Sequence, residues 1–139
     1  MEGIQLQFLD HVAIRVKDLE HSAKWYEEVL GLKRYTFAEW GPFPIFMLSG
    51  KTGVALFPVK TPNPQTLGSK DWLKIDHFAF NVDRTNFEKA QQRYEEMGLV
   101  YDFQDHVFFH SIYTLDPDGH KVELTTIVVD ESVFYGASV

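Results

Sequence analysis

The sequence of 139 residues predicts an α+β fold built from two βαβββ modules. Three observations support this fold class. A strand-like stretch, FLDHVAIRV at residues 8–16, returns in similar form as KIDHFAFNV at residues 74–82. A helical pattern follows each copy, and short β-like runs follow each helix. The chain therefore contains one supersecondary unit twice, which indicates a duplicated scaffold.

Both copies of the stretch alternate in polarity, as half-buried strands do. The first copy places His11 on the face opposite its apolar residues, and the second copy does the same with His77, 66 residues further along. Each strand is thus expected to give one face to a core and to carry a histidine on the other. The apolar faces consist of Val12, Ile14 and Val16 in the first copy and of Phe78, Phe80 and Val82 in the second.

A helix is predicted after each of these strands. Asp18 is placed to cap the first helix and Gly31 to end it. In the second module, Thr85 with Glu88 fits a capping box, and Gly98 is placed to end the helix. The predicted buried stripes are Leu19, Ala23, Tyr26 and Leu30 in the first helix and Phe87, Ala90, Tyr94 and Met97 in the second.

The remaining strands complete each module. Asp116-Pro117-Asp118-Gly119 has the residues of a type I turn and separates the last two strands. The predicted runs are 33–37, 44–49 and 54–59 in the first module and 100–103, 111–115 and 121–128 in the second. We therefore assign module one to residues 5–59, a Pro/Gly-containing linker to 60–72, module two to 73–129, and a C-terminal tail to 130–139.

Composition excludes several classes of function. The net charge is −7 and no Lys/Arg stripe offsets it, so nucleic acid is a poor partner. The absence of cysteine excludes disulfides and thiolate metal sites. The start of the chain does not have a basic segment followed by an apolar one, and no apolar run reaches the ~18 residues that span a bilayer. We expect a cytoplasmic protein that is not bound to a membrane.

A carboxylate in the last predicted strand completes a possible metal site. Glu123 interrupts an otherwise apolar and β-branched run, and an offset of 67 pairs it with Leu56 in the first module. If the modules pack about a pseudo-twofold axis, His11 and His77 face each other near that axis. Two imidazoles and one carboxylate suit divalent iron, manganese, cobalt, nickel or zinc and leave positions open for a chelating substrate. Asp10 and Asp76 also repeat, but alternation points them away, so we expect structural roles.

Several segments resemble the vicinal oxygen chelate superfamily, namely DHVAIRVKDLEHSAKWYEEVLGL, IDHFAFNV and DPDGHKVEL, and the similarity covers residues 8–126. This superfamily includes glyoxalase I, type I extradiol dioxygenases, fosfomycin-resistance proteins, methylmalonyl-CoA epimerase and bleomycin-binding proteins. The resemblance implies a glyoxalase-like fold, in which two βαβββ modules form a cup-shaped mixed sheet around a divalent metal. It maps the metal ligands to His11, His77 and Glu123. It also implies a homodimer, often with a cup built from both chains.

Departures from the family patterns bear on the reaction. Glyoxalase I and the epimerase have a fourth ligand at the position of Leu56, and leucine cannot coordinate a metal. Fosfomycin enzymes and extradiol dioxygenases keep three ligands and carry a tyrosine ten residues before the last one, which is Tyr113 here, with Ser111 on the same strand face. Fosfomycin enzymes, however, have a threonine where this chain has Ala13. They also have a basic phosphonate pocket near the C-terminus, whereas no Lys or Arg follows Glu123.

Further residues are expected to line a substrate pocket. Trp40, Phe43 and Phe46 lie in a Gly/Pro-punctuated segment and form either an aromatic pocket wall or ordinary core. His106 and His110 could supply the acid-base histidine of a dioxygenase, or lie in a loop or strand edge. The predicted substrate pocket comprises Trp40, Phe43, Phe46, Ser111 and His110.

The sequence thus predicts a metal-dependent enzyme, a lyase, isomerase or dioxygenase, acting on a small molecule that chelates through adjacent oxygens. Tyr113 and Glu123 are its predicted catalytic residues, with Tyr113 donating a hydrogen bond to a bound oxygen. Two alternatives stay open. One is a metal-free, drug-binding protein of the bleomycin-resistance kind, and the other is a fosfomycin-type thiol transferase. The tail residues 133–135 could pack on a partner subunit or cover the core.

Overall fold

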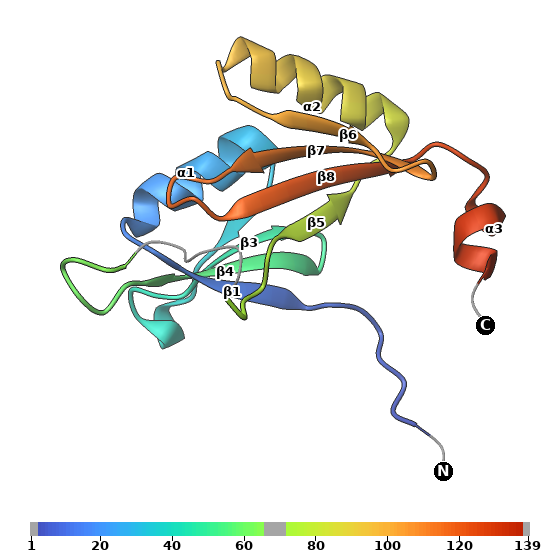
Figure 1. Ribbon diagram of the computed structural model, residues 1–139. Helices are drawn as coiled ribbons and strands as arrows, with labels where there is room; N and C mark the ends of the chain where they lie inside the picture. Colours follow the sequence, from blue (N-terminus) through green and yellow to red (C-terminus); the bar gives the residue numbers. More distant parts are fainter. Residues whose placement is uncertain (1–2, 66–71, 138–139) are drawn as a thin grey trace. The chain divides into compact units, whose positions relative to one another are not determined.

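A computed structural model describes residues 3–65 and 72–137 of the chain (Figure 1). The chain divides into two compact units, Met1–Pro64 and Gln65–Val139, and each is described by itself. The boundary falls within the predicted linker at 60–72, of which residues 66–71 lie outside the described part, as do tail residues 138–139. Over the described ranges, no helix has the length and apolar character needed to cross a membrane.

Unit 1 has the predicted βαβββ order. Its sheet has the strand order β1-β4-β3-β2, in which β1 runs parallel to β4 and the other neighbours are antiparallel. A 3₁₀ turn at Ala38–Trp40 precedes β3. The elements are β1 (His11–Val16), α1 (Leu19–Leu30), β2 (Lys33–Tyr35), β3 (Ile45–Ser49) and β4 (Thr52–Pro58).

Unit 2 repeats this topology with the strand order β5-β8-β7-β6, so the predicted fold class of two βαβββ modules is confirmed. In Figure 1, α2 lies along one face of the unit 2 sheet. The elements are β5 (Phe78–Asn81), α2 (Arg84–Glu96), β6 (Asp102–Asp105), β7 (Phe109–Leu115), β8 (Lys121–Ile127), α3 (Glu131–Phe134) and a 3₁₀ turn (Tyr135–Ala137).

Each unit buries an apolar layer between its helix and its sheet, as amphipathic elements require. In unit 1, Tyr26 of α1 is fully buried, and in unit 2, Tyr94 of α2 is fully buried. Successive residues of a strand point to opposite faces of the sheet. In β1 this alternation turns His11 away from the core, and in β7 it turns Ile112 into the core. The buried strand residues include Val16, Met47 and Leu56 in unit 1 and Ile112, Val122 and Leu124 in unit 2.

The first helix begins and ends as predicted. The Asp18 side chain accepts a hydrogen bond from the backbone N–H of His21 at 3.0 Å, which satisfies one unpaired donor of the first turn. Gly31 follows the last helical residue with φ 69°, a left-handed conformation that glycine adopts without a steric penalty.

The start of the second helix differs from the prediction. Asp83, and not Thr85, caps α2, because its carboxylate accepts from both the backbone and the side-chain N–H groups of Asn86 at 2.8 Å. The helix begins at Arg84, so Thr85 already lies in its first turn and the predicted capping box is wrong. The helix ends at Glu96, and Met97, predicted in the buried stripe, is 42% exposed.

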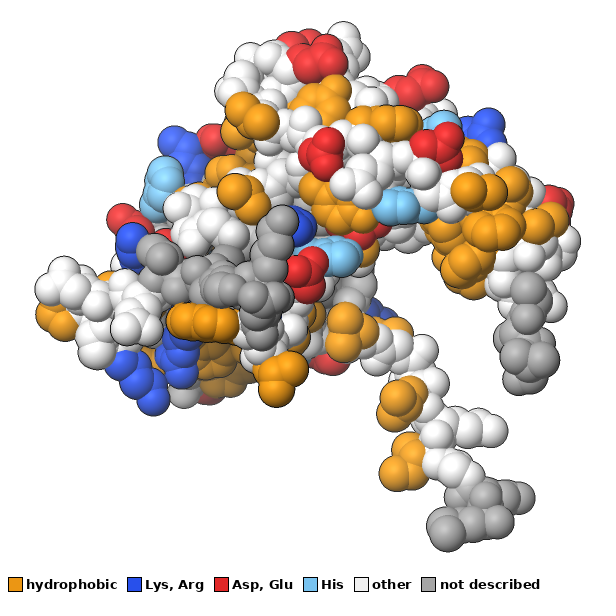
Figure 2. Space-filling model, viewed as in Figure 1, with side chains coloured by type: hydrophobic (Ala, Val, Ile, Leu, Met, Phe, Trp, Pro, Cys, Tyr) orange, Lys and Arg blue, Asp and Glu red, His pale blue; other side chains and the backbone are white. Residues whose placement is uncertain are grey.

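The C-terminal tail packs on the β6–β7 hairpin of its own unit. The Phe134 ring lies 4.7 Å from that of Phe109 and 5.7 Å from that of Phe108, measured between centroids. Figure 2 shows the resulting apolar cluster beside α3. Phe134 and Tyr135 keep about half of their surface exposed, at 42% and 56%. The tail therefore covers the hairpin only in part.

The correction at the second helix start can be tested by paired substitutions. Replacing Asp83 with alanine should lower the free energy of unfolding by about 1 kcal/mol, because two donors at the helix start lose their acceptor. Replacing Thr85 with alanine should change it by less than about 0.5 kcal/mol. Urea denaturation followed by circular dichroism measures both values. A larger loss from the Thr85 variant would restore the capping box.

Candidate functional site

His77 and Glu123 meet on one face of the unit 2 sheet. Ala79 of β5 pairs in parallel register with Glu123 of β8, and His77 precedes Ala79 by two residues, so both side chains emerge on the same face. The Nε2 atom of His77 lies 2.9 Å from Oε1 of Glu123. Glu123 is buried, whereas His77 is about one-third exposed. The structure thus brings together two of the three predicted metal ligands.

An aspartate fixes the orientation of each predicted histidine ligand. The Nδ1 atom of His77 lies 2.7 Å from the Asp76 carboxylate, and that of His11 lies 2.8 Å from the Asp10 carboxylate. Both aspartates were expected to point away from the site, but each carboxylate instead reaches the imidazole of the next residue. The signal was present in the sequence, since the Asp-His dipeptide itself repeats. A carboxylate on Nδ1 leaves Nε2 as the atom that can bind a ligand.

The charges around Asp76 support this arrangement. The hydrogen bond from His77, assisted by the positive charge of Lys121, holds the pKa of the Asp76 carboxyl below its usual value. The Lys121 ammonium lies 3.8 Å from the same carboxylate oxygen. Asp76 therefore remains an anion near neutral pH and remains an acceptor for Nδ1–H.

The donor set of His77 and Glu123 fits a cation. A neutral imidazole has one N–H, and if Nδ1–H donates to Asp76, Nε2 presents a lone pair. That lone pair would lie 2.9 Å from a carboxylate oxygen, which also presents lone pairs. Such an approach is favourable only with a proton or a metal ion between the two atoms. An imidazole nitrogen and a carboxylate oxygen are ordinary ligands of first-row divalent metals.

Ser111 holds the second oxygen of Glu123. Its hydroxyl lies 2.7 Å from Oε2 of Glu123 and 2.9 Å from the hydroxyl oxygen of Thr125. Because a carboxylate can only accept, Ser111 donates to Glu123 and accepts from Thr125. Ser111 is fully buried, so it positions Glu123 beneath the site and does not form a pocket surface as expected.

Tyr113 lies above this pair on the same face. It is the cross-strand neighbour of Glu123, and its ring centroid lies 5.5 Å from that of His77 in an edge-on arrangement. The Tyr113 hydroxyl lies 3.0 Å from Nε2 of His106. Burial, and then the charge of Glu123, raise the pKa of Tyr113 above its usual value. The phenol therefore keeps its proton at neutral pH and can donate a hydrogen bond.

Strand register changes the assigned counterpart of Glu123. In unit 2 the alanine two residues after the histidine, Ala79, pairs with Glu123, and in unit 1 the equivalent Ala13 pairs with Ala55. The counterpart is therefore Ala55 and not Leu56, which pairs with Ile14 and lies on the buried, helix-covered face. The conclusion about a fourth ligand is unaffected, because alanine cannot coordinate a metal either.

Unit 1 places aromatic side chains next to its histidine. The Phe46 ring lies 4.9 Å from that of His11 and 5.2 Å from that of Trp40. Phe43 stands apart from these rings and contacts Phe57 at 6.3 Å. The three residues of the predicted aromatic wall thus occur in the unit that carries His11, with Phe46 against the imidazole and Trp40 against Phe46.

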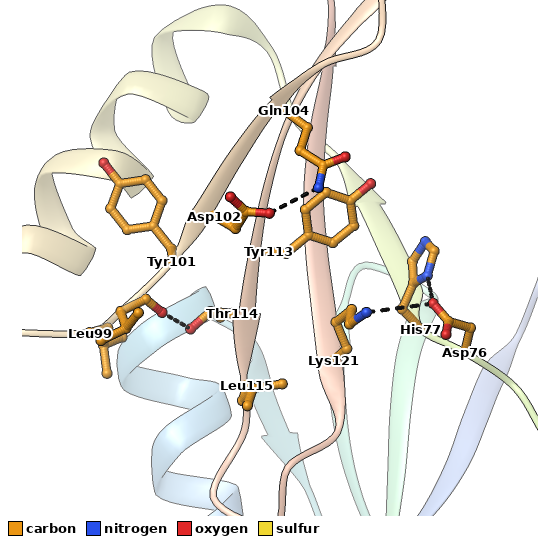
Figure 3. A pocket seen from close by; sticks show the side chains of 11 residues that line it. Asp76, His77, Leu99, Tyr101, Asp102, Gln104, Tyr113, Thr114, Leu115 and Lys121 are labelled. Carbon is orange, nitrogen blue, oxygen red and sulfur yellow. Dashed lines mark hydrogen bonds and ion pairs between the residues drawn. The ribbon is translucent and has the colours of Figure 1, made fainter. Parts of the chain in front are cut away.

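A cavity of about 770 Å³ lies beside His77 in unit 2 (Figure 3). Figure 3 shows the Tyr113 ring between Gln104 and His77, and Asp102 accepts a hydrogen bond from Gln104 at 2.9 Å. The cavity lining combines apolar side chains with acidic, basic and uncharged polar groups. It includes Asp76, His77, Val100, Tyr101, Asp102, Gln104, Tyr113 and Lys121.

The sequence pattern did not predict that polar residues of β6 belong to the site. Asp102 pairs with Tyr113 and Gln104 pairs with Ser111, so both lie on the face of the site. Their assignment needed the hairpin register, but the loop at Val107 and Phe108 contains none of the glycine, asparagine or proline residues that mark tight turns.

His110 is placed differently from the expectation. It precedes Ser111 on β7, so its side chain emerges on the opposite face, which α2 covers. There its ring lies 5.2 Å from Phe103, in a groove also lined by Phe87. His110 therefore does not line the cavity beside His77.

The three-ligand set itself stays a prediction. Over the ranges 3–65 and 72–137, no three His, Asp or Glu side chains come together as a ready ligand set. His77 and Glu123 belong to unit 2 and His11 to unit 1.

Comparison with known proteins identifies relatives over most of the chain. Residues 8–124 match the family model described as Glyoxalase/Bleomycin resistance protein/Dioxygenase superfamily. The glutathione transferase FosA of Serratia marcescens is 34% identical over 119 residues, which cover 86% of this chain and 80% of the relative. The metallothiol transferase FosB of Staphylococcus epidermidis is 28% identical over 138 residues, covering 95% and 90%.

A solved structure supports the fold independently. A glyoxylase/bleomycin resistance protein/dioxygenase domain from Frankia sp. EAN1pec aligns with a TM-score of 0.75 at 22% identity, covering 92% of this chain and 97% of that domain. At this identity the similarity shows the fold alone.

The buried hydrogen bond from Ser111 to Glu123 should contribute measurably to stability. Replacing Ser111 with alanine should lower the free energy of unfolding by about 1.5–3 kcal/mol, because a buried carboxylate loses its donor. Replacing the exposed Ser49 with alanine should change it by less than about 0.5 kcal/mol. Urea denaturation in the presence of a chelator compares the two. Equal small effects would show that Glu123 does not depend on Ser111.

Proposed function

The chain belongs to the Glyoxalase/Bleomycin resistance protein/Dioxygenase superfamily, and on that premise we propose that it is a divalent-metal-dependent enzyme acting on a small oxygen-bearing molecule. The observation that carries the proposal is the pair of His77 and Glu123 at 2.9 Å, each oriented by a second side chain. The curated relatives named above are enzymes, which supports catalysis over simple binding.

We assign His11, His77 and Glu123 as the metal ligands. The support is chemical: both histidines are anchored through Nδ1 by an aspartate, and Glu123 has one oxygen anchored by Ser111. A bound divalent ion would polarise two adjacent oxygens of a substrate as a Lewis acid. Iron, manganese, cobalt, nickel and zinc all accept such ligands.

The protein's own groups then act on the bound molecule. Tyr113 donates a hydrogen bond to a substrate oxygen, and its raised pKa keeps the donor proton in place. Asp76 maintains the tautomer and the direction of His77, and Ser111 does the same for the carboxylate of Glu123. The cavity lining of Val100, Tyr101 and Tyr113 supplies apolar surface for a small ligand.

Removal of a proposed ligand should abolish tight metal binding. Glu123→Gln keeps the shape of the side chain but removes its charge, and we expect cobalt(II) affinity to fall by more than about 100-fold, since loss of an outer-shell partner alone costs 10–100-fold. His11→Ala should have a comparable effect, and the exposed His21→Ala should have none. Native mass spectrometry measures the ion stoichiometry and, in the same spectrum, tests the homodimer that we also propose.

The outcomes separate an enzyme from a binding protein. Unchanged cobalt(II) affinity in Glu123→Gln would refute its role as a ligand. A parent protein that binds no divalent metal would favour the metal-free, drug-binding alternative. A spectrum with single subunits alone would refute the homodimer.

A second candidate function is thiol transfer to fosfomycin. It is favoured by the relatives, which are named as a glutathione transferase and a metallothiol transferase. The charges of this chain oppose it, because the cavity wall carries Asp76 and Asp102 against Lys121, and no Lys or Arg follows Glu123. A dianionic phosphonate needs several cationic donors.

A direct assay decides between the two functions. We expect the manganese-loaded or zinc-loaded protein to consume glutathione in the presence of fosfomycin no faster than the Glu123→Gln variant, because the phosphonate lacks cationic partners. Loss of free thiol and the appearance of an adduct by mass spectrometry are the measurements. Metal-dependent adduct formation above that control would establish thiol transfer as the function.

A further inference from the structure

His106 and Tyr113 form a side-chain pair at the edge of the candidate site. The Nε2 atom of His106 lies 3.0 Å from the Tyr113 hydroxyl, and the two rings are nearly perpendicular, at 89° with centroids 6.3 Å apart. This distance is that of a well-formed hydrogen bond. The pair joins residues seven positions apart, across the β6–β7 hairpin.

The hairpin determines where His106 lies. Its backbone N–H donates to the carbonyl of Phe109 at 2.8 Å, which closes the two-residue loop of Val107 and Phe108. His106 therefore continues the alternation of β6 and shares a face with Asp102 and Gln104, which pair with Tyr113 and Ser111. This face carries the candidate site, whereas His110 emerges on the other.

The loop backbone is held in an unusual conformation. Val107 has φ 71°, in a region that β-branched residues rarely adopt, and its N–H donates to the Asp105 carboxylate at 2.8 Å. The carbonyl of Phe108 also accepts from Val128 at 2.9 Å. These contacts hold the loop in place and, with it, the side chain of His106.

The partners of the Tyr113 hydroxyl set the direction of its hydrogen bonds. The hydroxyl has one proton, its oxygen lies 3.0 Å from Nε2 of His106, and the negative charge of nearby Glu123 helps to raise its pKa. In the proposed function this single proton is donated to a substrate oxygen, so the phenol oxygen has only lone pairs to offer His106. The contact at 3.0 Å is then made by the Nε2–H of His106 as donor and the phenol oxygen as acceptor.

We propose that His106 is a positioning residue that donates to the Tyr113 oxygen and thereby directs the phenol proton toward a substrate oxygen bound beside Glu123. This inference rests on the proposed function, in which Tyr113 donates to the substrate. His106 acts through Tyr113 and does not itself contact the reacting atoms. Its removal should weaken binding of an oxygen chelate without weakening binding of the metal.

The test uses cobalt(II) as the metal and acetohydroxamate as a bidentate oxygen ligand, both followed by visible absorption. In His106→Ala we expect cobalt(II) affinity within about twofold of the parent and acetohydroxamate affinity lower by about tenfold, the size of one hydrogen bond. His106→Gln, which retains an N–H donor, should recover most of that affinity. His110→Ala, from the same hairpin but the opposite face, is the matched control and should resemble the parent.

A double substitution separates positioning from general weakening of the hairpin. Tyr113→Phe should lower acetohydroxamate affinity by at least as much as His106→Ala, and adding His106→Ala to it should cause no further loss, because both act through one hydroxyl. Additive losses would overturn the inference, as would a glutamine variant as weak as the alanine variant.

Failure of the inference can be told apart from failure of the proposed function. Normal cobalt(II) binding with unchanged acetohydroxamate affinity in His106→Ala would overturn the role of His106 and leave the metal site intact. A parent protein that does not bind cobalt(II) would overturn the proposed function and this inference with it.

Discussion

The candidate site depends on one imidazole held between two carboxylates. The Asp76 carboxylate lies 2.7 Å from Nδ1 of His77, and the Glu123 carboxylate lies 2.9 Å from Nε2 of the same ring. A neutral imidazole can donate to only one of them, so the second contact needs a proton or a cation. Ser111 donates to one oxygen of the buried Glu123, and a proton or cation shared with Nε2 of His77 would offset the charge on the other.

Duplication explains which parts of this arrangement occur twice. The Asp-His pair repeats in both units, with the same contact between carboxylate and Nδ1. The acidic ligand does not repeat, because Ala55 stands where Glu123 stands in the second unit. The first unit instead places the ring of Phe46 near its histidine, and Trp40 lies against Phe46. The two halves have thus kept one function in common, orientation of an imidazole, and have diverged in the rest.

The polar face of unit 2 continues beyond the proposed ligands. Tyr113 connects Glu123 and His77 to the hairpin end, where His106 contacts its hydroxyl. Asp102 and Gln104 continue the same face along β6. A binding surface with acidic and amide groups suits ligands that offer hydrogen-bond donors better than it suits a dianion.

The sequence by itself determined the two βαβββ modules, the caps at Asp18 and Gly31, and the residue types of the proposed metal site, because alternation, helical spacing and capping are local patterns. Only the tertiary structure decided which residue opposes Glu123 and which face His110 takes. It also decided that Ser111 lies buried beneath Glu123 and that His106 reaches Tyr113. These four placements depend on strand register, which is set by pairing between segments distant in the sequence. A shift of one residue in that register reverses the face of every side chain in the strand.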